Sequence, residues 1–183
     1  MKNNDRIPSR EKCYALMAQY LMLPHIAEHE RVLTQAARLM QAARALDLPI
    51  TVTEQYPRGL GPTVPPIVAA AGDAPRLEKT TFSVCADEGC RAAVASAQRP
   101  QVLLVGIETH VCVQQTAVDL LEMQMRPFVL ADAVGSRRTL DHEVALHHLR
   151  GLGVAVTTVE SVIFALVRES GTELFKRILP IVR

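Results

Sequence analysis

The sequence predicts an α/β fold in three layers, with a doubly wound, mostly parallel six-stranded sheet covered by helices on both faces. Short apolar runs alternate along the chain with amphipathic stretches, as expected for parallel strands joined by crossover helices. The 183 residues suit one domain, and a hydrophobic content of 49% can fill a sizeable core. We find no internal repeat, low-complexity tract or linker. We therefore expect a single domain over residues 1–183, with its core at about residues 12–179.

Each expected element follows from its local pattern. The run at 101–105 is apolar nearly throughout, as in a strand buried on both faces. Val32, Ala36 and Leu39 form part of an apolar stripe at helical spacing. The Pro- and Gly-rich stretch at 55–74 predicts a long loop, and such loops are often functional. The predicted strands are 13–18, 49–53, 77–80, 101–105, 127–131 and 154–157, and the predicted helices are 26–46, 87–97, 111–123, 140–149, 161–167 and 173–179.

The overall composition argues against several classes of protein. The formal net charge is +1 and 21% of residues are charged, so nothing indicates a nucleic-acid or membrane-surface partner. No apolar run reaches the roughly 18 residues that a membrane span requires. Residues 1–12 lack the apolar core of a secretion signal. We expect a cytoplasmic protein, although the sequence leaves an organellar location open.

The four cysteines do not suggest a zinc site or a disulfide framework. None forms a CxxC pair, and no paired His spacing accompanies them. Reduced thiols are the simplest interpretation at this chain length. The cysteines are Cys13, Cys85, Cys90 and Cys112.

Cys112 is the leading candidate for a functional residue, because it lies in the first turn of a predicted helix that follows a buried strand. Free N–H groups and the helix dipole at such a position lower a thiol pKa and favour the nucleophilic thiolate. The same amides can hold an oxyanion during acyl transfer. From position alone, an inert buried cysteine explains Cys112 equally well.

Five segments in chain order resemble motifs of the isochorismatase-like cysteine hydrolases. The resemblance is to the branch with a TEQYP-type loop and a GIETHVC-type nucleophile motif, and it runs from about Lys12 to Leu179. It implies the same α/β fold and hydrolysis of a small molecule. The segments are TEQYPRGLG at 53–61, EKTTFS at 78–83, VGIETHVCVQQTA at 105–117, ADAVGSR at 131–137 and TTVES at 157–161.

The resemblance implies a site built on an Asp, a Lys and a Cys. Lys79 matches the family lysine and Cys112 the nucleophile, while Gln19 aligns with a family Gln and puts the Asp position on Met17. Loss of one positioned acid–base group typically lowers a rate about 100- to 10,000-fold. Without its usual partner, a buried Lys79 should have a lowered pKa.

The resemblance also implies a cis peptide bond between Ile107 and Glu108. The backbone N–H of Glu108 would then join that of Cys112 in an oxyanion hole. Glu54 and Glu108 are candidate substitutes for the missing carboxylate, although a structural or rim position explains each of them better.

The pocket loops of the family carry Tyr56 and Phe82 here, which could stack on a flat substrate or belong to the core. The nicotinamidase branch binds a metal through an Asp and two His, whereas this chain has Thr-Glu-Gln at 53–55. We therefore predict no metal and no cofactor. His110 is interpreted as a structural side chain or a pocket wall, and His142, His147 and His148 as surface or interface residues.

Two functions remain open, and the identity of Met17 separates them. The first is an enzyme that cleaves a small amide, imide or ester through the Cys112 thiolate. The second is a catalytically degenerate member that binds a ligand or partner without turnover. A nuclease, suggested by ribonuclease names in a similar branch, is disfavoured because the sequence offers no basic, aromatic-lined surface. Relatives of this fold assemble into dimers or rings, so we expect a homo-oligomer.

Overall fold

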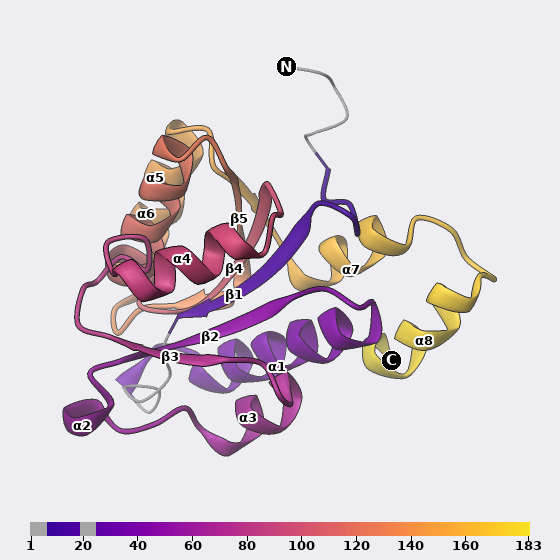
Figure 1. The fold of residues 1–183 in the computed structure, drawn as a ribbon, viewed down its shortest axis with the longest axis horizontal. Helices are drawn as coiled ribbons and strands as arrows, with labels where there is room; N and C mark the ends of the chain where they lie inside the picture. Colours follow the sequence, from indigo (N-terminus) through magenta and orange to yellow (C-terminus); the bar gives the residue numbers. More distant parts are fainter. Residues whose placement is uncertain (1–6, 19–24) are drawn as a thin grey trace.

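The computed structural model describes residues 7–18 and 25–183, and six of its segments form one parallel sheet in the order β3-β2-β1-β4-β5-β6 (Figure 1). Every strand pairing in the described residues is parallel, so the predicted α/β class is confirmed. The strands are β1 Cys13–Ala18, β2 Ile50–Gln55, β3 Arg76–Lys79, β4 Gln101–Ile107, β5 Arg126–Gly135 and β6 Ala155–Thr157.

Helices cover both faces of this sheet (Figure 1). One face packs against α1, α3, α7 and α8, and the other against α4, α5 and α6. A single π-helical turn at Thr109–Val113 leads into α5. The helices are α1 His29–Ala45, α2 Pro57–Leu60, α3 Pro65–Ala71, α4 Glu88–Ser96, α5 Gln114–Glu122, α6 Thr139–Gly151, α7 Val159–Val167 and α8 Glu173–Val182.

The central strand β1 contributes to both apolar layers. Cys13, Ala15 and Met17 pack on the α1 side, while Tyr14 and Leu16 pack on the α4–α5 side. This alternation follows from the two-residue period of a strand. The chain order reverses between β1 and β4, and in such sheets ligands bind beyond the carboxyl ends of the strands near that point. The nucleophile motif follows the carboxyl end of β4 and therefore lies at the switch point.

The sequence prediction was wrong for residues 55–74, which contain α2 and α3 instead of an unbroken loop. Pro57 and Pro65 stand at the starts of these helices. Proline lacks an N–H but fits a first helical turn, so a composition that suggests a loop also suits two short helices. Strand β5 extends to Gly135, four residues beyond the predicted end. Gln19, which sets the alignment of the family Asp position, lies outside the described residues.

The buried thiols predict a loss of stability at alkaline pH. Burial raises the pKa of Cys13 and Cys90 to about 12 and that of Cys85 to about 11. Above the pKa of the unfolded thiols, roughly 8.5, the unfolded chain releases protons that the folded chain retains, so stability falls as pH rises. Urea denaturation between pH 9 and 10.5 should show a loss of about 1.4 kcal/mol per pH unit for each such thiol.

A Cys13→Ala variant is the matched control for this measurement. In this variant the free energy of unfolding should fall less steeply with pH, by about 1.4 kcal/mol per pH unit, because one buried thiol is missing. A free energy of unfolding that stays constant over this range would contradict the burial of these thiols.

Candidate active site

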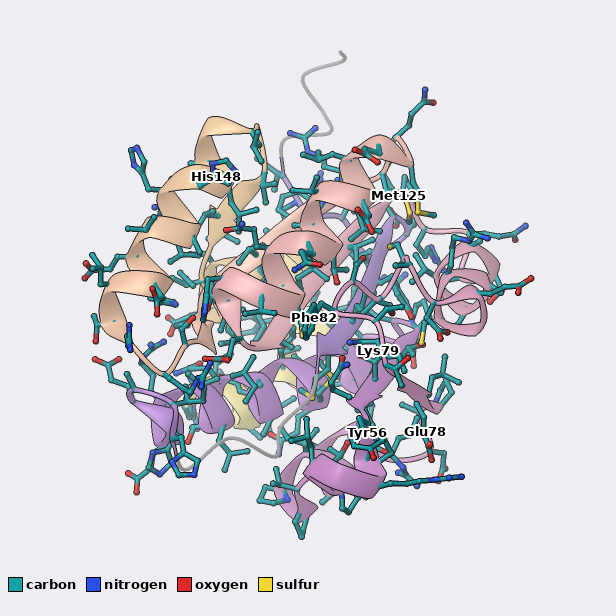
Figure 2. All side chains as sticks on the ribbon, turned by 90° about the vertical axis from the view of Figure 1, so that its left-hand side faces the viewer. Tyr56, Glu78, Lys79, Phe82, Met125 and His148 are labelled. Carbon is teal, nitrogen blue, oxygen red and sulfur yellow. The ribbon has the colours of Figure 1, made fainter. Side chains whose placement is uncertain are left out.

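A cavity of about 90 Å³ lies at the carboxyl ends of β2 and β4, and Cys112 forms part of its wall. A second recess of about 300 Å³ at the end of β3 is lined by Lys79, Tyr56 and their neighbours. Figure 2 shows Phe82, Lys79 and Tyr56 one below the other on the same side of the molecule. The small cavity is lined by Gln55, Leu60, Phe82, Ile107, Glu108, Val111 and Cys112.

Cys112 lies in the π turn and is only 6% exposed. Burial raises the pKa of its thiol above the ordinary value. The positive charge of Lys79 and hydrogen bonds from the backbone of Glu108 and Cys112 act in the opposite direction. The expectation of a lowered thiol pKa is therefore wrong for the unliganded protein, because desolvation outweighs the charge and the amides.

Lys79 ends β3 and is 3% exposed. Its ammonium donates to Oε1 of Gln55 and to the backbone oxygens of Thr81, at 2.9 Å, and Phe82, at 3.1 Å. Burial lowers the pKa of Lys79, and the charge of a Cys112 thiolate opposes this most strongly. The direction agrees with the sequence expectation. The charges of Lys79 and Cys112 act on each other, and Gln55, which accepts a hydrogen bond from Lys79, also lines the Cys112 cavity.

Met17 packs in the core and lines neither cavity. It pairs in the sheet with Val52 and Val105, and its side chain is 0% exposed in the apolar cluster that also holds Ile107. Its backbone oxygen accepts a hydrogen bond from the Thr53 hydroxyl at 3.0 Å. The position that aligns with the family Asp thus supplies no polar group to Lys79.

Glu54 and Glu108 are both engaged in structural contacts. Oε1 of Glu54 accepts hydrogen bonds from the backbone N–H and the hydroxyl of Thr63, at 2.8 and 2.6 Å. Oε2 of Glu108 accepts from the backbone N–H and Nε of Arg137, both at 3.0 Å. Each carboxylate therefore fastens a loop, in keeping with the structural interpretation.

Two further acids near the site also have partners. Asp87 caps α4 by accepting the N–H of Cys90 at 2.9 Å, and Asp119 accepts the Ser83 hydroxyl at 2.5 Å. Residues 19–24, which follow β1, contain no acidic residue. None of these four acids makes a direct ion pair with Lys79 in the described residues.

The turn that carries Cys112 is held by the segment after β5. The peptide bond between Ile107 and Glu108 is cis, as the resemblance implies. Residues 108–110 each bond to a side chain or backbone group within 136–142, which fixes the turn at three successive positions. These contacts join Glu108 to Arg137 at 3.0 Å, Thr109 Oγ1 to His142 Nδ1 at 2.9 Å, and His110 Nδ1 to Ser136 Oγ at 2.9 Å.

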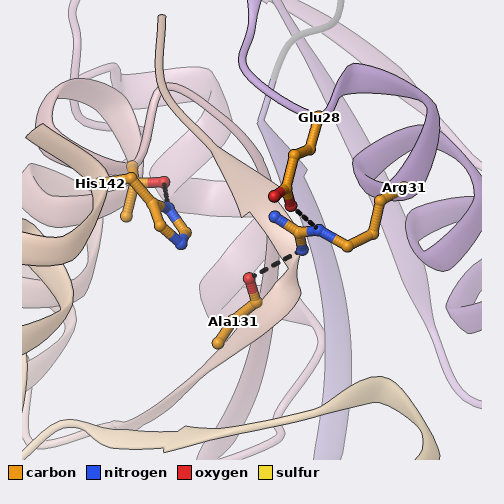
Figure 3. A network of polar contacts seen from close by, with 5 residues as sticks. Glu28, Arg31, Ala131 and His142 are labelled. Carbon is orange, nitrogen blue, oxygen red and sulfur yellow. Dashed lines mark hydrogen bonds and ion pairs between the residues drawn. The ribbon is translucent and has the colours of Figure 1, made fainter. Parts of the chain in front are cut away.

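Figure 3 shows the surroundings of His142, with its ring turned toward the Thr109 hydroxyl. Across from it, Arg31 forms an ion pair with Glu28 at 2.6 Å and donates to the backbone oxygen of Ala131 at 3.2 Å (Figure 3). Burial lowers the pKa of His142, with help from the charge of Arg31. His110 and His142 therefore support the turn, whereas His147 and His148 are exposed on α6. The interpretation of His142 as a surface or interface residue was wrong, because its ring is half-buried against Thr109.

Tyr56 and Phe82 are rim residues and not core residues, with exposed fractions of 53% and 55%. Tyr56 adopts a left-handed backbone conformation at φ 45°. Its ring lies so close to Gly59 that a Cβ there would approach Cε1 within 2.2 Å. Gly59 is therefore needed for the ring to occupy this place beside the Lys79 recess.

Gln55 is the site residue that sequence reasoning missed. Its side chain lines the Cys112 cavity and accepts a hydrogen bond from Lys79. The available signal was its place at the carboxyl end of β2, where a polar side chain faces the switch point.

Comparison with known proteins shows which family this chain belongs to. A family model described as the isochorismatase domain matches residues 16–161. The chain belongs to the isochorismatase family. It is 43% identical over 155 residues to zebrafish (Danio rerio) isochorismatase domain-containing protein 2, covering 85% of this chain and 78% of that protein. A mouse (Mus musculus) relative, isochorismatase domain-containing protein 2A, is 42% identical over 87% of this chain and 76% of its own length.

Solved structures show the same fold. The MAR1 ribonuclease of Caenorhabditis elegans superposes with a TM-score of 0.90 and 35% identity, covering 96% of this chain and 92% of that one. The YcaC gene product of Escherichia coli, an octameric hydrolase of unknown specificity, has a TM-score of 0.87 at 23% identity, with coverage of 95% and 91%. The second likeness bears on the fold alone.

Residues 7–18 and 25–183 contain neither a cluster of metal-binding side chains nor a helix suited to cross a membrane. Within these ranges, no three His, Cys, Asp or Glu side chains gather in a way that could hold a metal ion. Over the same ranges, no helix is both long and apolar enough to cross a membrane.

Proposed function

We propose that this isochorismatase-family protein cleaves a small amide, imide or ester through the Cys112 thiolate. The observation that carries the proposal is that Cys112 and Gln55 line one small cavity at the switch point of the sheet, while the Lys79 ammonium donates a hydrogen bond to Gln55. A nearby ammonium favours the thiolate once the buried thiol loses its proton. The site is thus suited to a thiolate that forms at alkaline pH or on substrate binding.

The reaction would proceed in two covalent steps. The thiolate sulfur bonds to the carbonyl carbon, and the bond from that carbon to the leaving group breaks, which gives a thioester on Cys112. The backbone N–H groups of Glu108 and Cys112, which already act on the thiol, would stabilise the oxyanion in between. Water then attacks the thioester and releases a carboxylic acid and the free thiol. The exposed rings of Tyr56 and Phe82 would suit a flat substrate.

The alternative is a degenerate member that binds a ligand without turnover. It is favoured by the apolar Met17 and by the engagement of Glu54 and Glu108 with Thr63 and Arg137. RNA cleavage, which the name of the C. elegans relative would suggest, receives less support. Among the described residues that line the two cavities, the cations are Lys79 and Arg58, and Lys79 already donates to three oxygens.

Acylation by a small aryl ester tests the proposed function. After incubation with p-nitrophenyl acetate at pH 8, intact-mass spectrometry should show one acetyl group per chain. Cys112→Ala should take up none. Cys13→Ala, which changes a cysteine at the amino end of β1 and away from the cavity, should react like the unchanged protein. Equal labelling of the Cys112→Ala variant would rule out Cys112 as the nucleophile, and a complete absence of labelling would favour the binding role.

The expected homo-oligomer and cytoplasmic location remain predictions. The side chains of Leu140 and Val144 lie one turn apart on α6 and are exposed, as subunit contacts often are before assembly. Light scattering on the purified protein would give the subunit number.

A further inference from the structure

We propose that Gln55 positions Lys79 in place of a carboxylate, and that a site built this way favours acyl compounds whose leaving group departs as an anion. Aryl esters and thioesters belong to this class, whereas amides and alkyl esters do not. The inference rests on the proposed function, because it concerns what Cys112 can attack productively.

The side chains of Gln55 and Lys79 lie side by side because β2 and β3 pair at these two residues. Gln55 and Lys79 are paired at the ends of β2 and β3, and both are buried, with exposed fractions of 8% and 3%. Nε2 of Gln55 donates to the backbone oxygen of Thr80 at 2.6 Å. That bond fixes the orientation of the amide, so Oε1 and not Nε2 faces the Lys79 ammonium.

The acceptors around Lys79 fit a cation. An ammonium has three N–H bonds, and its three acceptors, on Gln55, Thr81 and Phe82, are all uncharged oxygens. A neutral amine has only two N–H bonds and would turn its lone pair toward the third oxygen. Lys79 held in this way serves as a fixed positive charge, and its natural counter-ion is the Cys112 thiolate or the oxyanion formed from it.

The same arrangement leaves the leaving group without an obvious proton donor. Each Lys79 N–H already has an acceptor, Glu54 faces the opposite side of β2 from Gln55, and Glu108 is bound to Arg137. Two further acids, Glu78 and Asp87, line the Lys79 recess and not the Cys112 cavity, and Asp87 caps α4. An amine must gain a proton to leave a tetrahedral intermediate, whereas a phenolate or thiolate leaves with its electron pair and needs none. Attack by Cys112 therefore leads on to the thioester when the bond from the carbonyl carbon to the leaving group can break to release a stable anion.

The next step is affected as well. Hydrolysis of the thioester requires a base to take a proton from the attacking water, and neither Lys79 nor Gln55 can act as that base in this state. The acyl-enzyme should therefore accumulate. The expected kinetic signature is a rapid release of one leaving group per chain, followed by a slow steady rate.

Leaving-group dependence is the first test. The unchanged protein is mixed with p-nitrophenyl acetate, S-phenyl thioacetate and p-nitroacetanilide, and each acylation rate is divided by the rate of alkaline hydrolysis without protein. We expect enhancements for the ester and the thioester at least 100-fold above that for the anilide. An equal enhancement for the anilide would overturn the inference and leave the nucleophile intact.

Substitution of Gln55 is the second test, with Gln41→Glu on the exposed side of α1 as the charge-matched control. Gln55→Glu puts a negative charge beside Lys79, so the pH midpoint of Cys112 alkylation should rise by about one unit or more. The new carboxylate can also serve as a base, so the slow phase should accelerate about 100-fold or more. Gln55→Leu should raise the midpoint without accelerating the slow phase. The control should behave like the unchanged protein.

The outcomes separate the two proposals. A Gln55 with only a structural role would change rates in both variants while the alkylation midpoint stayed in place, which would overturn the positioning role. Far-UV circular dichroism and melting curves on the same samples identify a variant that has failed to fold, and the leaving-group comparison needs no variant. If no acyl compound labels Cys112 in the unchanged protein, the proposed function itself fails.

Discussion

Replacing Lys79 with methionine is expected to lower the rate of Cys112 alkylation at pH 7 by roughly tenfold to a thousandfold. An opposite charge in close contact typically shifts a pKa by about 1–3 units, and the charge of Lys79 lowers the pKa of the Cys112 thiol against the effect of burial. Without that charge, less thiolate is present at any pH below the midpoint. The measurement is the rate of Cys112 alkylation by iodoacetamide from pH 6 to 10.

The pH profile distinguishes this electrostatic effect from a loss of structure. The midpoint should rise in Lys79→Met, and the rates of the two proteins should converge at high pH. Lys176→Met, which removes an exposed lysine from α8, serves as the control and should leave the midpoint unchanged. A Lys79→Met profile that superimposes on that of the unchanged protein would show that Lys79 does not act on the thiol.

Replacing Met17 with aspartate is expected to destabilise the fold at pH 7 by roughly 4 kcal/mol. Full burial can raise a carboxyl pKa by about 3–5 units, so each of the roughly three pH units between the unfolded pKa of about 3.9 and pH 7 contributes about 1.4 kcal/mol. Met17 is fully buried among Val52, Val105 and Ile107, where a carboxylate has no polar partner in the described residues. The folded-state pKa lies above the unfolded value of about 3.9, so the penalty is absent below that pH and grows as pH rises through it.

Urea denaturation at pH 4 and pH 7 measures this effect. The difference between Met17→Asp and the unchanged protein should be several kcal/mol larger at pH 7 than at pH 4. Met17→Leu is the control, with an expected loss under about 1.5 kcal/mol. A Met17→Asp protein as stable as the unchanged one at pH 7, and faster in ester hydrolysis, would mean that the new carboxylate reaches Lys79.

Much of the fold was predictable because its signals are local. The apolar run of β1 was placed at its observed bounds, and the strand predicted at 101–105 begins where β4 begins and ends two residues before β4 ends. The helices α2 and α3 were missed because the prolines that start them also mark loops. The π turn at Thr109–Val113 was expected as an α-helical start, since no composition rule separates the two.

Two candidate residues of the site could be named from the sequence, but neither their energetics nor their polar neighbours could. Cys112 and Lys79 came from motifs that stand in the sequence itself. The raised pKa of the Cys112 thiol depends on packing by residues distant in the chain, which no local pattern reports. Glu108 meets Arg137 across 29 positions in the sequence, so its engagement could not be anticipated. Gln55 shows the same limit, because only the β2–β3 register reveals that it faces Lys79.

The identity of the acylated residue tests the central claim most directly. The unchanged protein is incubated briefly with p-nitrophenyl acetate, quenched in acid and digested, and the acetyl group is located by tandem mass spectrometry. The account predicts that the acetyl group sits on Cys112 at early times, with a labelling rate that rises with pH from 7 to 9. An acetyl group found first on Lys79, Ser83 or Cys85, with Cys112 unmodified, would contradict it.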